Sequence, residues 1–133
     1  MTAVPEAIDL AVAAARAAAE KKAEEIIAID VSERLALTDV FVVLSGRNDR
    51  HVRSIVDAVD EEMLKQGAKR KLREGFAEGH WVLLDYGDII VHVQQEEDRE
   101  FYALERLWKD CPLLELPADI ADLAAAAPAP ELD

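Results

Sequence analysis

The chain has little of several features that mark particular classes of protein. Among its 133 residues there is one cysteine, Cys111, so no disulfide can form within the chain. A lone thiol is typical of a reducing compartment and predicts a cytoplasmic location. The apolar runs are short, such as Val40 to Leu44, whereas a membrane span requires about 20 apolar residues. The first ten residues have no basic stretch ahead of an apolar block, so we expect neither a secretory signal nor a membrane among the partners.

Basic residues are also scarce. Lysine and arginine total 15, against 28 aspartates and glutamates, and the net charge is -13. Such a chain repels phosphate backbones unless it carries a local basic stripe, and the one short candidate is Lys69-Arg70-Lys71. We therefore expect little direct nucleic-acid contact, and a basic protein as the better-matched partner.

Motifs for catalysis and for metal or cofactor binding are missing. The five glycines make no Gly-x-Gly or P-loop spacing. Ser45-Gly46 is better explained as a strand end than as an active-site turn. The three histidines come without a cysteine pair or a two-histidine helical motif, so neither a metal nor a cofactor is expected. Asp85 and Asp88 flank a tight turn, where acids more often form turns than bind metal, although a metal-dependent nucleotidyltransferase-like enzyme remains an alternative.

What the chain does have is a clear order of amphipathic segments within the length of one domain. Continuous β-branched and aromatic residues predict a central strand at 40–44, buried on both faces. The link 85–88 contains glycine and predicts a hairpin. The order α-β-β-α-β-β-β-α predicts an α/β fold, with a mixed sheet of about five strands flanked by helices. The predicted helices are 5–22, 49–67 and 96–109, and the predicted strands are 25–31, 40–44, 69–73, 81–84 and 89–93.

The composition changes after residue 110. Prolines interrupt an alanine-rich stretch, and residues 110–133 contain six acids and no base. This predicts a division into a folded domain, 1–110, and an acidic, Pro/Ala-rich tail, 111–133, that is mobile apart from a helical turn near 119–125.

Aromatic residues and an arginine gather in the predicted hairpin and last helix. Residues of these types are typical anchors of protein interfaces. The alternative is that the two tryptophans simply belong to the core, which we expect for at least one of them. The gathered residues are Trp81, Tyr86, His92, Arg99, Tyr102 and Trp108.

Two strings in this order resemble the ribosomal silencing factor family, also called Iojap-like. The resemblance covers roughly residues 6–109. The first string is Thr38-Asp39, an apolar strand, Ser45-Gly46, Arg50-His51-Val52 and Ile55. The second and more specific string is Glu74-Gly75, Trp81, Asp85, Gly87-Asp88, Val91-His92-Val93, Glu96-Glu97, Arg99, Tyr102, Leu104-Glu105 and Leu107-Trp108.

The resemblance implies a protein without enzymatic activity. Its fold would be similar to that of nucleotidyltransferases but would lack their catalytic acids. It would bind large-subunit ribosomal protein fourteen, block joining of the small subunit and lower translation under nutrient limitation. It would often form homodimers when free. A dimeric interaction module with another basic protein partner is a further alternative.

The hairpin and last helix are the predicted docking surface for that partner. Acidic side chains would face its basic residues, and aromatic side chains would supply apolar contact. The predicted partner-binding residues are Trp81, Asp85, Asp88, His92, Glu96, Glu97, Arg99, Tyr102 and Trp108.

Overall fold

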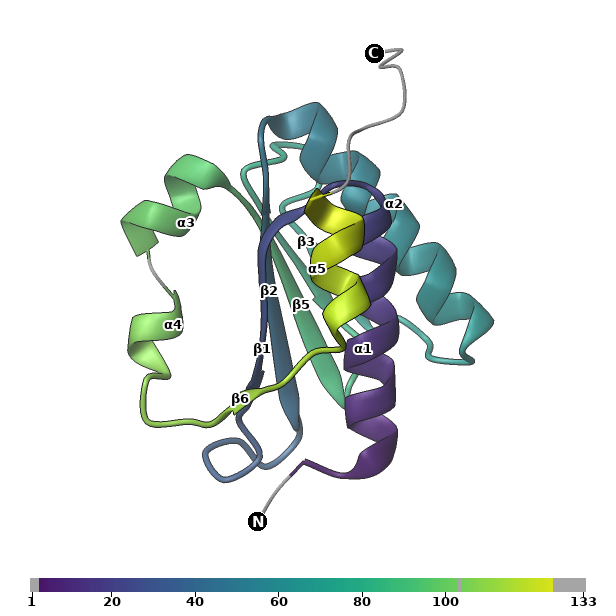
Figure 1. Cartoon of the computed structure of the whole chain (residues 1–133), viewed down its shortest axis with the longest axis vertical. Coiled ribbons are helices and arrows are strands. Elements are labelled where there is room, and N and C mark those ends of the chain that lie inside the picture. The colour runs from purple at the N-terminus through teal and green to yellow at the C-terminus, as the bar shows by residue number, and fades with distance from the viewer. Residues whose placement is uncertain (1–2, 103, 126–133) are drawn as a thin grey trace.

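The structure is a computed structural model that describes residues 3–102 and 104–125, without the side chains of residues 101, 102, 104 and 105. One mixed sheet separates a helical layer, at the right in Figure 1, from two short helices at the left. The helices are α1 (Pro5–Glu20), α2 (Asp49–Lys65), α3 (Glu96–Tyr102), α4 (Leu104–Leu107) and α5 (Ala118–Ala125). The strands are β1 (Glu24–Asp30), β2 (Val40–Gly46), β3 (Leu72–Glu74), β4 (Trp81–Asp85), β5 (Ile89–Gln95) and β6 (Leu113–Leu114).

The sheet has the strand order β3-β4-β5-β2-β1-β6. β2 and β5 are parallel, and every other neighbouring pair is antiparallel. The predicted α/β class with a mixed sheet is confirmed, and the order of the predicted elements is retained. The sheet has six strands rather than about five because the segment after residue 110 adds β6.

β2 lies at the centre of the sheet, as its apolar run predicts, and all seven of its residues are buried. Alternate side chains of a strand point to opposite faces. Val42 and Leu44 therefore enter the core under the helices, while Phe41 and Val43 belong to a second cluster on the other face.

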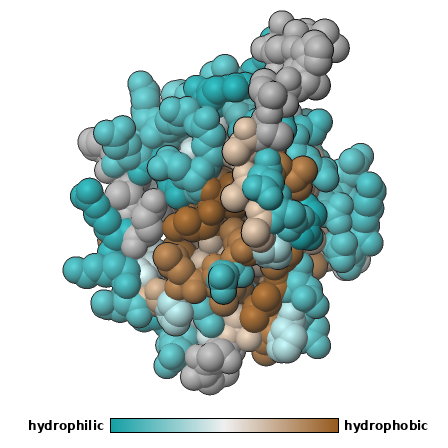
Figure 2. All heavy atoms as spheres, in the orientation of Figure 1, coloured by the Kyte–Doolittle hydropathy of each residue, from teal (hydrophilic) through white to brown (hydrophobic). Residues whose placement is uncertain are grey.

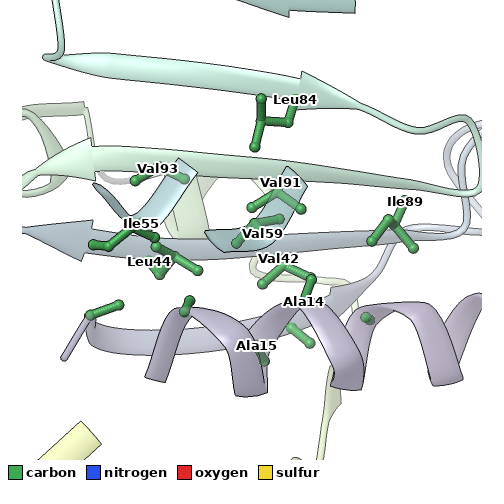
Figure 3. Packing of buried hydrophobic residues seen from close by; sticks show 14 of the residues in the cluster. Ala14, Ala15, Val42, Leu44, Ile55, Val59, Leu84, Ile89, Val91 and Val93 are labelled. Atoms are coloured by element: carbon green, nitrogen blue, oxygen red, sulfur yellow. The ribbon is translucent and has the colours of Figure 1, made fainter. Parts of the chain in front are cut away.

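The main core lies between the sheet and helices α1 and α2. In Figure 3, Ala14 and Ala15 of α1 lie against the valines and leucines of the central strands, and Ile55 and Val59 of α2 pack beside them. Alanine side chains allow α1 to approach the sheet closely, which explains why this helix is buried although its apolar stripe is narrow.

Helix α2 begins at a polar cap. The Asn48 side chain accepts a hydrogen bond from the His51 main-chain N–H at 2.8 Å. The strand that follows this helix, β3, runs parallel to β2 but lies at the sheet edge, with β4 and β5 between them. The connection from β2 through α2 to β3 therefore passes over β4 and β5, two strands that come later in the sequence.

Residues 112–125 differ from the tail that the composition predicts, because they join the packed domain. Leu113 and Leu114 pair with β1, and the Asp30 N–H donates to the Pro112 carbonyl oxygen at 2.8 Å. Helix α5 packs on α1, with Ile120 only 2% exposed. These contacts join segments about a hundred residues apart, which local composition does not reveal. Residues 126–133 of the predicted tail lie outside the described residues.

Polar contacts also join the second half of α1 and the residue after it to α5. Arg16 donates two hydrogen bonds to the Asp119 carboxylate, each at 3.0 Å, and the Lys22 amine donates to the Leu123 carbonyl oxygen at 2.9 Å. None of the helices in the described ranges is long and apolar enough to cross a membrane.

Candidate functional site

The face of the sheet opposite α1 and α2 is the candidate site, and we call it the open face. The same alternation that sends one set of strand residues into the main core sends the other set here. Its apolar centre is a small cluster of buried residues, Ile29, Val31, Phe41 and Val43, with half-buried hydrophobic residues packed around it. The half-buried residues are Ile27, Leu35, Trp81, Ile90, Trp108 and Cys111.

Hydrophobic side chains of the sheet also reach the surface. In Figure 2 they gather over the middle of the molecule, where β1 and β6 lie in Figure 1, and most of the surrounding surface is hydrophilic. Leu72 on β3 is 45% exposed, and Leu113 on β6 is 66% exposed. Leu72 pairs with Asp85 and so shares the open face with it. A hydrophobic surface with a polar rim is typical of protein-binding sites.

Aromatic rings form the middle of the open face. The Phe41 ring packs edge-on against His92, with ring centres 4.9 Å apart, and against Trp108 at 5.0 Å. The Trp81 ring lies 6.1 Å from His92. The Arg34 guanidinium lies 5.0 Å from the centre of the Trp108 ring. The structure thus brings Trp81, His92 and Trp108 together around Phe41.

Phe41 is the member of this cluster that sequence reasoning missed as a site residue. Its strand is apolar throughout, so the sequence pattern indicates only a core position for it. The available signal was its odd position in the alternation of β2, between Val40 and Val42, which both enter the main core.

His92 lies beneath the surface, at 5% exposure. Its Nδ1 accepts a hydrogen bond from the Trp81 indole N–H at 3.2 Å, so the ring carries its proton on Nε2. Burial lowers the pKa of His92 to about 4, so the ring is neutral at physiological pH. A neutral buried ring orients Trp81 and is not a charged contact for a partner.

Arg99 is also buried, at 5% exposure, so it does not lie on the surface as a predicted anchor would. Tyr86 faces the other side of the sheet, where its hydroxyl donates to the Asp60 carboxylate. Burial raises the pKa of Tyr86 well above its ordinary value. The Tyr102 side chain lies outside the described residues.

The predicted acidic residues form two groups. Asp85 and Asp88 lie at one end of the β4–β5 hairpin, while Glu96 and Glu97 lie beyond the other end of β5 and are exposed. Because β5 has seven residues at about 3.3 Å each, the two groups are about 20 Å apart. The acids therefore flank the aromatic centre at both ends.

The two aspartates shape the turn. The Asp85 carboxylate accepts from the Gly87 N–H at 2.8 Å, and Gly87 has a φ of 89°, which favours glycine. The Asp88 carbonyl oxygen accepts from the Asp39 N–H at 2.9 Å. At the other end, a hydrogen bond with the Glu24 carboxyl raises the pKa of Glu96, because two acids share one site.

The remaining histidines have structural contacts. The Nδ1 atom of His51 accepts from the Arg47 N–H at 3.0 Å, and its Nε2 lies 2.7 Å from the Lys21 carbonyl oxygen. His80 lies 3.2 Å from Asp98. Within residues 3–102 and 104–125, no three histidine, cysteine or acidic side chains gather into a group that could hold a metal ion.

The chain is similar to known proteins of one family. The family model described as "Ribosomal silencing factor during starvation" matches residues 4–132. The chain is 39% identical over 103 residues to the ribosomal silencing factor RsfS of Bacillus subtilis, an alignment that covers 77% of this chain and 87% of that protein. It is 32% identical over 117 residues to the chloroplastic protein Iojap of Zea mays, covering 86% of this chain and 50% of that protein.

A solved structure shares the fold. A crystal structure of a protein from Chromobacterium violaceum superimposes with a TM-score of 0.75 at 30% sequence identity, and the match covers 77% of this chain and 85% of that one.

Proposed function

The chain belongs to the family of ribosomal silencing factors, which are non-catalytic ribosome-binding proteins, and we propose that its open face docks on protein fourteen of the large ribosomal subunit. Docking there excludes the small subunit and lowers translation when nutrients are limiting. The protein acts in the cytoplasm. The observation that supports the proposal is that this member of the family has a half-buried aromatic surface with acidic groups at both ends.

The aromatic centre supplies the apolar part of the contact. Trp81, Ile90 and Trp108 are half-buried in the free protein, so a partner can still remove part of their surface from water. The rings are held in place by Phe41 and His92 before binding, and a rigid surface loses little side-chain freedom when it docks. Aromatic residues in such positions contribute much of the binding free energy of protein interfaces.

The acidic residues supply orientation. Asp88, Glu96 and Glu97 are exposed at the two ends of the open face, and the whole chain carries a net charge of -13. A basic ribosomal protein is attracted to such a surface from a distance, and the two separated acidic groups fix how it lies across the sheet. Exposed charges are screened over roughly 8 Å at physiological salt, so raising the salt concentration should weaken binding.

The mechanism is steric and involves no reaction. The silencing factor and the small subunit compete for one face of the large subunit, so each lowers the other's affinity by the same factor. An excess of small subunits should therefore displace the factor, and an excess of the factor should reduce the population of joined ribosomes.

The test is co-sedimentation of the protein with purified large subunits, followed by addition of small subunits. Leu83→Glu is the informative variant, because Leu83 is half-buried on the open face and pairs with His92 across β4 and β5. We expect its affinity for the large subunit to fall by at least about 30-fold, as when an interface hot spot is lost. Trp81→Glu should have a similar effect.

A matched control is Ala121→Glu, which adds the same charge to an exposed residue of α5, on the other side of the sheet. It should bind as the unmodified protein does. If both open-face variants fold and bind normally, the open face is not the docking surface.

Homodimerisation of the free protein is part of the same proposal. An exposed hydrophobic sheet face is typical of surfaces that pair with a second copy when the partner is absent. Sedimentation equilibrium should then detect a dimer for the unmodified protein and for Ala121→Glu, and a monomer for Leu83→Glu. A dimer of unchanged stability in Leu83→Glu would assign the two contacts to different surfaces.

A further inference from the structure

A short segment of the chain has the opposite charge to the rest. Residues 65–73 contain Lys65, Lys69, Arg70, Lys71 and Arg73 and no acid. The whole chain has 15 basic residues, so the remainder carries ten bases against 28 acids. One third of the positive charge is thus concentrated between the end of α2 and β3, at the edge of the sheet.

These basic side chains are available for binding. All five residues are exposed. Arg70 forms an ion pair with Asp60, and Arg73 lies over the Phe76 ring with its charged carbon 4.0 Å from the ring centre. Among the described residues, no carboxylate lies within 4.0 Å of the amines of Lys65, Lys69 or Lys71.

Two of the basic residues, Lys69 and Arg70, border a hollow of about 640 Å³. Its wall includes Leu64, which is 76% exposed, and Ala68, with Lys69 and Arg70 at the same site. Of the two acids there, Asp60 is bound by Arg70 and by the Tyr86 hydroxyl, whereas Glu61 is exposed. A largely apolar hollow with a lysine and an arginine at its wall suits an unpaired nucleotide, whose base packs on hydrophobic atoms while its phosphates meet the basic side chains.

We propose that residues 65–73 form a second contact surface that binds the phosphate backbone of ribosomal RNA on the large subunit. The inference rests on the proposed docking of the open face, because this chain as a whole is too acidic to bind RNA without another anchor. It adds one local nucleic-acid contact to an interface that is otherwise with a protein.

The position of the segment supports an RNA partner over a protein partner. β3 carries Leu72 and Glu74 on the open face. Lys69 and Lys71 directly precede this strand in the sequence, so they lie beside the edge of the proposed protein contact. A basic ribosomal protein would be repelled by this segment. The anionic material that surrounds ribosomal proteins on a subunit is RNA, and its phosphates match the lysines.

The test compares Lys69→Gln/Lys71→Gln with the unmodified protein in binding to intact large subunits over a range of salt concentrations. Each lost phosphate contact should reduce the slope of log affinity against log salt by about 0.7–0.9, so the double variant should lose between one and two. Its affinity at low salt should fall on the order of tenfold. Binding to isolated protein fourteen, without RNA, should not change.

The matched control is Lys21→Gln/Arg50→Gln, which removes the same charge from an exposed lysine at the end of α1 and an exposed arginine at the start of α2. These two helix ends meet where the His51 ring contacts the Lys21 carbonyl oxygen, away from residues 65–73 at the other end of α2. If the control reduces the salt slope as much as the test variant, or if the test variant behaves as the unmodified protein does, the RNA contact is refuted. A loss of binding to isolated protein fourteen in Lys69→Gln/Lys71→Gln would assign the segment to the protein partner and would also refute it.

A direct readout is practical because the chain has one native cysteine to replace. In a Cys111→Ser background, Lys69→Cys can carry an iron chelate that cleaves nearby RNA by hydroxyl radicals. Cleavage of ribosomal RNA from position 69 and none from a chelate at Arg50→Cys is the expected result, and the reverse pattern refutes the proposal. Failure of the proposed docking would look different, since the unmodified protein would then not bind isolated protein fourteen at all.

Discussion

The two faces of the sheet are built from the same strands but have opposite characters. The face under α1 and α2, which we call the closed face, is lined by aliphatic residues such as Val42, Leu44 and Val91, which are 0% exposed. The open face has rings, a buried histidine and half-buried hydrophobic residues. The first face has completed its contacts within the chain and stabilises the fold, whereas the second still has apolar surface that a partner can bury.

Truncating one residue on each face should give the largest difference in the loss of folding stability. Leu44→Ala leaves a cavity in the closed core and should lower the free energy of unfolding by about 2–5 kcal/mol. Ile90→Ala, on the open face, should cost less, because its side chain is only half-buried. Urea denaturation of both variants measures the difference, and equal losses would show that the two faces are packed alike.

The second prediction concerns pH, because His92 is the buried titratable ring of the open face. Its folded pKa of about 4 lies below the ordinary value of 6.5, so the unfolded chain binds more protons between these values. Its contribution to stability is present above about pH 6.5 and is lost as the pH falls towards 4, by at most about 3 kcal/mol. Denaturant melts at pH 7 and pH 5 measure it.

The control for this prediction is a histidine outside the open face. In His92→Gln, most of the loss of folding stability between pH 7 and pH 5 should disappear. In His80→Gln the loss should be the same as in the unmodified protein, since His80 is exposed. If the pH dependence of stability is the same in His92→Gln as in the unmodified protein, His92 is not the residue responsible.

A smaller effect is expected from the polar contact under the closed face. Tyr86→Phe removes the hydroxyl that donates to Asp60, and the loss of such a hydrogen bond costs about 1–2 kcal/mol. Binding to isolated protein fourteen should not change, because Tyr86 faces away from the open face. A variant that unfolds as easily as Leu44→Ala would show that this hydrogen bond is as important as the core.

The smallest effect should come from the rim of the closed face. Arg16 and Asp119 form an exposed ion pair, and such pairs contribute less than about 1 kcal/mol. Asp119→Asn should therefore change the melting temperature by only a few degrees. A drop comparable to that of a core truncation would mean that α5 depends on this pair and not on the burial of Ile120.

Sequence reasoning located most elements of the fold because their patterns are local. The apolar run at β2, the turn at Asp85–Asp88 and the stripe of α2 each depend on residues within one segment. β6 and α5 were not predicted as parts of the domain. Their stability comes from pairing with β1 and packing on α1, and these partners are about a hundred residues away.

The candidate site was predicted in part for the same reason. The aromatic group was visible because Trp81, His92 and Trp108 stand out in the sequence, and the structure places them together. The burial of His92 and Arg99, and the separation of the two acidic groups by the length of β5, follow from how strands and helices pack.

The family, the order of the elements and the central position of β2 can all be inferred from the residues alone, because motif spacing and hydrophobic periodicity are properties of neighbouring residues. Which face of the sheet is covered, and where the lysines of residues 65–73 lie, depends on how the elements pack. A strand offers two equivalent faces, and the helices that cover one of them determine which residues remain available for a partner.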